Sequence, residues 1–197
     1  GGLVGWNFGA ISNSSATGDV SANATGDVSA NATGGDAYAG GLVGVNGSVA
    51  ISNSSATGNV SANATGASAS AGGLVGYNYG AISNSSATGN VNANAAITHA
   101  GGLVGWNWGG SINIAYASGS VSGNDNVGGL VGKNENGTIS NAYASGAVTG
   151  TNQVGGLVGN HTGTGSIAQT YAIGKVVGTG TDVGGLVGKA DGSANVS

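Results

Sequence analysis

The fold is decided by the stretch Gly128-Gly129-Leu130-Val131-Gly132 and by the block that follows it, Ile139-Ser140-Asn141-Ala142-Tyr143-Ala144-Ser145-Gly146-Ala147-Val148. The string Gly-Gly-Leu-Val-Gly occurs seven times in 197 residues, and a block with Ile, Gly and Val in that order follows the first six copies. The units start near residues 1, 40, 72, 101, 128, 155 and 184 and are 27–39 residues long. Such recurrence is typical of repeat architectures, in which one unit cannot bury its own apolar side chains.

Each unit contains three short apolar runs, namely Leu-Val, Ile with Tyr or Ala, and Val. Gly and Asn separate the runs and supply turns with positive φ, and the abundant Gly and β-branched residues disfavour helix. The sequence therefore predicts an all-β fold, a parallel β-helix (β-solenoid) of about seven coils of 27–39 residues, with three short strands per coil. We expect a single solenoid domain over residues 1–197, right-handed by analogy with parallel crossovers.

Two other architectures compete with the β-helix. A disordered Gly/Ser-rich linker has no reason to keep Leu, Ile and Val in register seven times. An antiparallel barrel or a propeller remains an alternative, although propeller blades need about 40 residues and most of these units are shorter.

Stacked coils place equivalent side chains in columns, and we expect three apolar columns to line the interior. The first column is Leu3, Leu42, Leu74, Leu103, Leu130, Leu157 and Leu186. The second is Ile11, Ile51, Ile82, Ile112, Ile139 and Ile167. The third is Val20, Val60, Val91, Val121, Val148 and Val176. Strand parity predicts that Tyr116, Tyr143 and Tyr171, four residues after their Ile, also point inward or pack at a corner.

A further Val column directly follows the Leu residues and consists of Val4, Val43, Val75, Val104, Val131, Val158 and Val187. Neighbours in a continuous strand face opposite sides of the sheet, so an inward Leu predicts an outward Val. This column would then form a lateral contact stripe, because exposed apolar surface usually marks association sites. The alternative is a turn between Leu and Val that buries both.

Two amide columns also run through the repeat. The first is Asn7, Asn46, Asn78, Asn107 and Asn134, with His161 in the sixth coil. The second is Asn13, Asn53, Asn84, Asn141 and Gln169, interrupted by Ile114. We expect both to form ladders hydrogen-bonded from coil to coil. Ile114 favours an inward second column, because an apolar side chain is poorly placed in water.

Asn-x-Ser/Thr sequences are acceptor motifs for glycosylation, which requires an exposed Asn. Asn23, Asn31 and Asn63 are the candidates, because they fall in the connection whose length varies between units. We interpret that connection as a surface loop. Asn13, Asn53 and Asn84 also carry the motif, but they cannot be both ladder members and glycan carriers.

Composition excludes several classes of function. The chain has 44 Gly, no Pro and no Cys, and three Lys oppose seven carboxylates to give a net charge of −4. Three Lys cannot form the basic surface of a nucleic-acid binder, and disulfides and Cys-based metal sites need thiols. No run of about 18 apolar residues is present, so we expect no transmembrane segment.

No constellation of catalytic residues is recognisable, so we expect no enzyme activity, no cofactor and no metal site. The seven carboxylates are spread along the chain, and His99 and His161 lack the further ligands that zinc needs. Thr17, Thr57 and Thr88 align as in an ice-binding solenoid, but Ser and Ile replace Thr in the later coils.

The unit Gly-Gly-Leu-Val-Gly-x-Asn … Ile-x-Asn-Ser/Ala-Tyr-Ala-x-Gly-x-Val resembles the GLUG motif of bacterial surface proteins. That motif recurs in large secreted adhesins and in the non-catalytic region of immunoglobulin A peptidases. The resemblance covers essentially the whole chain and is clearest from Leu103 to Val187, whereas the first three units have Ser-Ser-Ala-Thr-Gly in place of the Tyr form. It implies a β-solenoid on a cell surface or in the extracellular matrix, and it carries no catalytic residues.

We therefore expect a non-enzymatic, secreted structural protein, either a segment of an adhesin or a subunit of a surface or matrix fibre. The sequence begins and ends inside a unit, with no recognisable signal peptide or capping unit, which favours a piece of a longer chain. Uncapped strand edges template further pairing, so we expect copies to stack end to end into filaments. A passive stalk of a larger adhesin or peptidase is the alternative, and binding of ice or of a host or matrix carbohydrate or protein are further ones.

Overall fold

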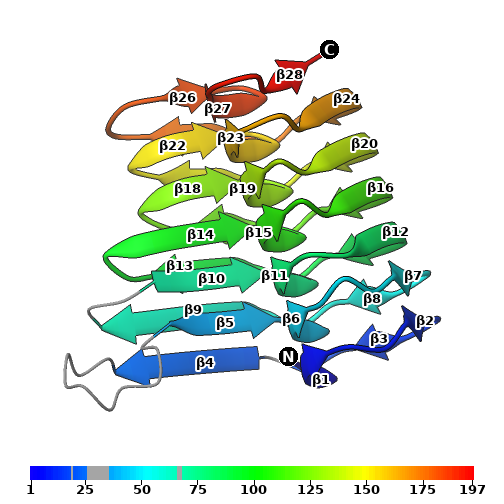
Figure 1. Ribbon diagram of the computed structural model, residues 1–197. Coiled ribbons are helices and arrows are strands. Elements are labelled where there is room, and N and C mark those ends of the chain that lie inside the picture. The colour runs from blue at the N-terminus through cyan, green and yellow to red at the C-terminus, as the bar shows by residue number, and fades with distance from the viewer. Residues whose placement is uncertain (19, 26–35, 66–67) are drawn as a thin grey trace.

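The computed structural model describes residues 1–18, 20–25, 36–65 and 68–197, whose strands wind into a β-solenoid (Figure 1). Within these ranges every strand pair is parallel, and each strand pairs with its equivalent in the next turn. Val75, Tyr77 and Asn78, for example, lie opposite Val104, Trp106 and Asn107. The predicted parallel β-solenoid is thus confirmed. These residues contain no helix long and apolar enough to cross a membrane.

Four sheets line the described solenoid, so the prediction of three strands per coil is wrong. Sheet A consists of β1 (Val4–Asn7), β6 (Val43–Asn46), β11 (Val75–Asn78), β15 (Val104–Trp108), β19 (Val131–Glu135), β23 (Val158–Thr162) and β27 (Val187–Ala190). Sheet B consists of β2 (Ile11–Ser12), β3 (Ser15–Ala16), β7 (Ile51–Ser52), β8 (Ser55–Ala56), β12 (Ala81–Ala87), β16 (Ser111–Ala117), β20 (Thr138–Ala144), β24 (Ser166–Ala172) and β28 (Asn195–Val196).

The other two sheets, C and D, pack against each other in a separate cluster. Sheet C consists of β4 (Val20–Thr25), β9 (Val60–Thr65), β13 (Val91–Asn94), β17 (Val121–Ser122), β21 (Val148–Gly150) and β25 (Val176–Gly178). Sheet D, the strand missed in each unit, consists of β5 (Ala37–Gly40), β10 (Ser68–Gly72), β14 (Ile97–Gly101), β18 (Asp125–Gly128), β22 (Asn152–Gly155) and β26 (Val183–Gly184). The described chain makes six full turns and a partial seventh with β27 and β28, close to the expected seven coils.

The core has two layers that correspond to the two pairs of sheets. Leu, Val, Ile and Ala side chains from sheets A and B form one cluster, in which Leu103, Val104 and Ile112 are fully buried. Val and Ala side chains from sheets C and D form the second cluster, which includes Val121 and Ala100. The inward Leu and Ile columns and the described part of the Val column are confirmed for the inner turns. Because the second cluster contains only Val and Ala, the coil is thin there.

The Val column that follows each Leu does not form an exposed stripe. Val43, Val75, Val104, Val131 and Val158 are fully buried, while Val4 and Val187 in the end turns are partly buried. The amides of Leu103 and Val104 both donate to the carbonyl of Leu130, at 2.8 and 3.0 Å, so the chain turns between the two residues. The expected lateral contact stripe is therefore wrong, because successive amides that point the same way break strand parity.

Gly102 explains why this corner starts with glycine. A Cβ at Gly102 would collide with the backbone oxygen of Gly129 and would lie 2.8 Å from the Cβ of Ala117. Gly129 stands in the same relation to Gly156 one turn later. The Gly before the Leu of each inner turn therefore allows two backbones to approach at the corner.

A left-handed residue in the middle of each sheet B segment turns the second amide column outward. Asn13, Asn53, Asn84, Asn141 and Gln169 have φ between 47° and 53°, and Ile114 has φ of 51°. All six side chains are exposed, so the expected inward ladder is wrong at these positions. Asn is the non-glycine residue that adopts this conformation most readily, which explains the column better than hydrogen bonding does.

The same left-handed residue shifts the alternation of side chains, so the prediction that the tyrosines point inward is also wrong. Tyr116 and Tyr171 are exposed and Tyr143 is partly exposed, whereas Ala115 and Ala142 point into the core. The rings of Tyr116 and Tyr143 are 5.1 Å apart and nearly parallel, and those of Tyr143 and Tyr171 are 5.0 Å apart. The tyrosines thus stack along the outside of sheet B.

The first amide column forms the predicted ladder inside the solenoid. Each Nδ2 donates to the Oδ1 of the next turn, from Asn7 to Asn46 at 2.9 Å, through Asn78 and Asn107 at 2.8 Å, to Asn134 at 2.7 Å. The Nδ2 of Asn134 then lies 3.1 Å from the Nδ1 of His161. The second amide hydrogen reaches a backbone carbonyl, as from Asn107 to Gly110 at 2.9 Å. These hydrogen bonds offset the desolvation cost of burying the amides, so the column is stable in an apolar core.

Candidate functional site

Of the three glycosylation candidates, the structure describes the side chain of Asn63 alone. Asn31 lies outside the described residues, and of Asn23 only the backbone is described, within strand β4. Asn63 lies in strand β9 rather than in a loop, is half-buried, and donates to the Oγ of Ser61 at 3.1 Å. Exposed acceptor motifs occur instead at Asn13, Asn53 and Asn84, which the left-handed backbone turns outward.

The outer side of sheet A carries an aromatic surface that sequence reasoning missed. Positions on either side of each ladder Asn point away from the core, because strand residues alternate between the two faces. In the first, third and fourth turns these positions are aromatic, and we call the six residues the aromatic face: Trp6, Phe8, Tyr77, Tyr79, Trp106 and Trp108. Four of them are well exposed: Trp6 65%, Phe8 74%, Tyr79 45% and Trp108 43%.

The rings of the aromatic face contact each other within and between turns. The centroid of Tyr77 lies 4.7 Å from that of Tyr79 and 4.8 Å from that of Trp106. Trp106 and Trp108 stack at 5.5 Å, and Trp6 and Phe8 stack at 5.6 Å. These distances lie in the range of favourable aromatic pairs, so the rings hold one another in place.

The second turn interrupts the face and leaves a hollow. Val45 and Gly47 occupy the two outward positions there, and Val45 lies in register between Trp6 and Tyr77. A cavity of about 520 Å³ is lined by Trp6, Phe8, Gly47, Ser48, Val49 and Tyr79. A second cavity, of about 180 Å³, is lined by Trp6, Tyr38, Val45, Tyr77 and Tyr79. The face therefore has protruding rings beside an apolar hollow.

From the fifth turn onward the same positions are polar. The Nζ of Lys133 lies 4.5 Å from the centre of the Trp106 ring and 2.8 Å from the Oε2 of Glu135. Lys189 pairs with Asp191 at 2.9 Å on the partial seventh turn. Lys133 thus closes the aromatic face through a cation–π contact, which desolvation of the pair strengthens.

Two titratable side chains beside the aromatic face, His99 and Tyr38, are uncharged at neutral pH. Burial, with the charge of Lys133, lowers the pKa of His99 to about 4, so the imidazole is uncharged at neutral pH. His99 stacks on Trp106 at 4.6 Å and its Nδ1 lies 3.2 Å from the Oγ of Ser70. Burial and the carboxylate of Asp36 raise the pKa of Tyr38 to about 12. The described residues include no cluster of three His, Asp or Glu side chains that could hold a metal ion.

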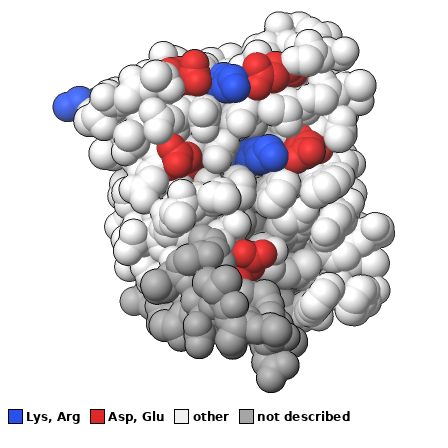
Figure 2. All heavy atoms as spheres, turned by 60° about the vertical axis from the view of Figure 1, so that its left-hand side comes forward, with Lys and Arg blue, Asp and Glu red and all other residues white. Residues whose placement is uncertain are grey.

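Charged side chains are sparse over the neighbouring surface as well. Figure 2 shows few blue and red side chains among the white ones, and two of the blue side chains stand beside red ones. The strands β1, β6, β11 and β15 contain no charged residue. These four strands therefore present aromatic and apolar side chains, which can make ring-stacking and apolar contacts.

A sequence pattern could have revealed the aromatic face. Trp6-Asn7-Phe8, Tyr77-Asn78-Tyr79 and Trp106-Asn107-Trp108 place aromatic residues two apart around an Asn already assigned to the interior. Period-two alternation then requires the rings to lie outside.

Comparison with known proteins supports the resemblance found in the sequence. Three segments match the family model described as the GLUG motif, namely residues 1–21, 67–92 and 123–149. No curated protein and no solved structure matches the chain.

Proposed function

We propose that the chain, three segments of which match the GLUG-motif model, is a non-enzymatic, extracellular structural protein. It would be a stiff segment of a surface adhesin or matrix fibre that associates laterally through its aromatic face. The observation that carries this proposal is the exposure of Trp6, Phe8, Tyr79 and Trp108 on one side of sheet A. Contiguous apolar surface of this kind usually marks an association site, and aromatic residues are enriched at the centres of interfaces.

A second copy of the chain is the partner that the shape of the face favours. The protruding rings of Trp6 and Phe8 stand beside the hollow at Gly47, so two faces related by a two-fold axis are complementary in knobs and holes. The four strands under the face carry no charge, so two copies meet without like-charge repulsion. The extracellular location is supported by the resemblance of the repeat to the GLUG motif of bacterial surface proteins.

Sedimentation velocity of the 197-residue chain over a wide concentration range tests this function. We expect a reversible monomer–dimer equilibrium that Trp6→Ser and Trp108→Ser together weaken at least about tenfold, because each removes a ring from the contact. Thr162→Ala, at the same outward position as Trp108 but two turns further along, is the matched control and should associate like the wild type.

The opposite outcome identifies the alternative function. A single monomeric species at every concentration would contradict the proposed lateral association. It would favour the alternative function, a passive stalk of a larger adhesin or peptidase. Electron micrographs separate side-by-side pairs from the end-to-end filaments expected from the sequence.

A further inference from the structure

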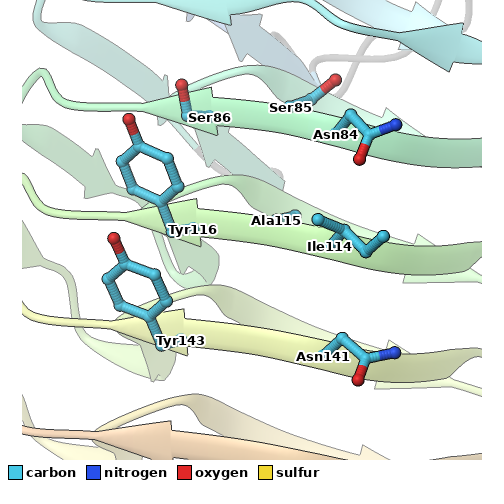
Figure 3. Close-up of a pocket in the computed structure, with 8 residues that line it drawn as sticks. All are labelled: Asn84, Ser85, Ser86, Ile114, Ala115, Tyr116, Asn141 and Tyr143. Atoms are coloured by element: carbon cyan, nitrogen blue, oxygen red, sulfur yellow. The ribbon is translucent and has the colours of Figure 1, made fainter.

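A groove beside the tyrosine column on sheet B is a second surface, distinct from the aromatic face. It has a volume of about 310 Å³ and is lined by Asn84, Ser85, Ser86, Ile114, Ala115, Tyr116, Asn141 and Tyr143. Figure 3 shows Ser86, Tyr116 and Tyr143 along one side, Asn84, Ile114 and Asn141 along the other, and Ser85 and Ala115 between them. We call this the tyrosine groove; its volume is at the small end of the range for ligand sites, about 300–1,000 Å³.

The groove lies where the tyrosine column ends. Tyr116 has a stacking partner on one side only, the ring of Tyr143 at 5.1 Å. Ser86 occupies the equivalent position in the preceding turn, so no ring of the protein covers Tyr116 from there. An aromatic ring with one free face is the usual platform on which another ring can stack.

Ile114 forms the opposite wall in a conformation that disfavours it. Its φ is 51°, a left-handed value that β-branched residues rarely adopt, while the equivalent positions in the other turns carry Asn or Gln. Its side chain is also 53% exposed, so burial in the core does not compensate for the strain. Strain of this kind persists mainly at functional sites, and here it places an apolar side chain across the groove from Tyr116.

Neutral hydrogen-bonding groups surround this apolar pair. Asn84 and Asn141 flank Ile114 by one turn on each side, which is about 4.8 Å along the axis. The side chains of Asn84 and Ser86 make no hydrogen bond to the described residues, whereas the Nδ2 of Asn141 donates to Asn113 at 2.9 Å and leaves its Oδ1 free to accept. No charged residue lines the groove.

We propose that the tyrosine groove binds a pyranose ring of a neutral glycan, which stacks on the free face of Tyr116 beside Ile114 and whose hydroxyls are hydrogen-bonded to Asn84, Ser86 and Asn141. A pyranose has apolar C–H faces and a rim of hydroxyls, which matches an apolar centre flanked by amides and a hydroxyl. A charged sugar finds no counter-charge here, and an aromatic side chain of a protein would leave the amides unpaired, which is costly.

NMR titration of the intact chain with cellotetraose, mannotetraose and chitotetraose tests the proposal. We expect at least one of these neutral oligosaccharides to change the chemical shifts of the Tyr116 ring, the Ile114 methyl groups and the side-chain amides of Asn84 and Asn141. All three Trp residues lie on the aromatic face of sheet A, so Trp fluorescence should not change. Absence of binding by all three probes at millimolar concentration, or shifts centred on the Trp residues, would overturn the assignment.

Other turns of the chain supply matched variants that preserve the fold. Ile114→Asn introduces the residue of the equivalent positions, and Tyr116→Ser introduces the residue of the first three turns. Each should weaken binding about tenfold, the upper end of what one ring or side-chain contact provides, while Tyr171→Ser should leave it unchanged. Equal loss in all three variants, or full binding by folded Ile114→Asn, would contradict the site.

Discussion

The solenoid contains two columns of asparagine that share a spacing but not a role. Asn78, Asn107 and Asn134 are fully buried and bonded to one another, whereas Asn84 and Asn141 are exposed and have left-handed backbones. The inner column is selected by the amide, which can both donate and accept between turns. The outer column is selected by the backbone, because Asn tolerates positive φ. The same residue is therefore repeated for two different physical reasons, hydrogen bonding in the inner column and positive φ in the outer column.

Removing one amide from the inner column should have the largest effect. Asn107→Ala leaves the Oδ1 of Asn134 without a donor and the Nδ2 of Asn78 without one of its acceptors, while the carbonyl of Gly110 keeps only the amide of Thr138. With about 1–3 kcal/mol for each unsatisfied buried group, we expect the free energy of unfolding to fall by about 3–5 kcal/mol. Chemical denaturation measures this free energy. A loss below about 1 kcal/mol would mean that the ladder contributes little to the stability of the fold.

Acid should destabilise the fold through a buried group that, unlike the amides, can titrate. The pKa of His99 is about 4 in the folded chain and about 6.5 when unfolded, so the unfolded chain binds the proton first as pH falls. The contribution of neutral His99 to the free energy of unfolding should therefore be fully present above about pH 6.5 and should fall by up to about 3 kcal/mol towards pH 4. His99→Asn, the residue found at the next turn of sheet D, should flatten this part of the pH profile in denaturation experiments. An unchanged slope in that variant would assign the acid sensitivity elsewhere.

In the outer column, replacing the strained residue should stabilise the chain. Ile114→Asn keeps a φ of 51° but removes the β-branched side chain from it, so we expect a gain of about 1–2 kcal/mol in the free energy of unfolding. Thermal unfolding of the variant and the wild type provides the comparison. A loss of stability would show that the exposed Ile114 side chain supports the fold, and would weaken the case for a ligand.

The smallest effect should come from an ordinary member of the outer column. Asn141→Gly retains easy access to the left-handed conformation and gives up a single exposed hydrogen bond, to Asn113 at 2.9 Å. We expect the unfolding free energy to change by less than about 0.5 kcal/mol. A change as large as that of Asn107→Ala would erase the difference between the two columns.

The sequence sufficed for the features that depend on repetition and apolarity. Leu103, Ile112 and Val121 lie in the core as predicted, and the Asn107 ladder follows from stacking identical amides. These predictions hold because parallel in-register pairing requires only that the same residue recurs at the same place.

The errors arose wherever the backbone departs from a regular strand. Val104 was expected outside because parity was continued through a corner, and Tyr116 was expected inside because parity was continued through the left-handed residue at 114. Sheet D was missed because segments such as Ser68–Gly72 are made of Ala, Ser and Gly, which carry little strand preference. The tyrosine groove depends on the left-handed backbone at residue 114, which turns Ile114 and Tyr116 outward, so composition alone could not locate it.

The central claim is that consecutive turns stack in register, and a designed disulfide tests it most directly. The chain has no Cys, and Ser122 on β17 lies opposite Thr149 on β21. Neighbouring strands lie about 4.8 Å apart, within the range that a disulfide spans, so Ser122→Cys with Thr149→Cys should crosslink readily under mild oxidation. The pair Ser122→Cys with Thr138→Cys, on sheets C and B, should not. Equal crosslinking of both pairs, or none in the first, would contradict the stacked solenoid.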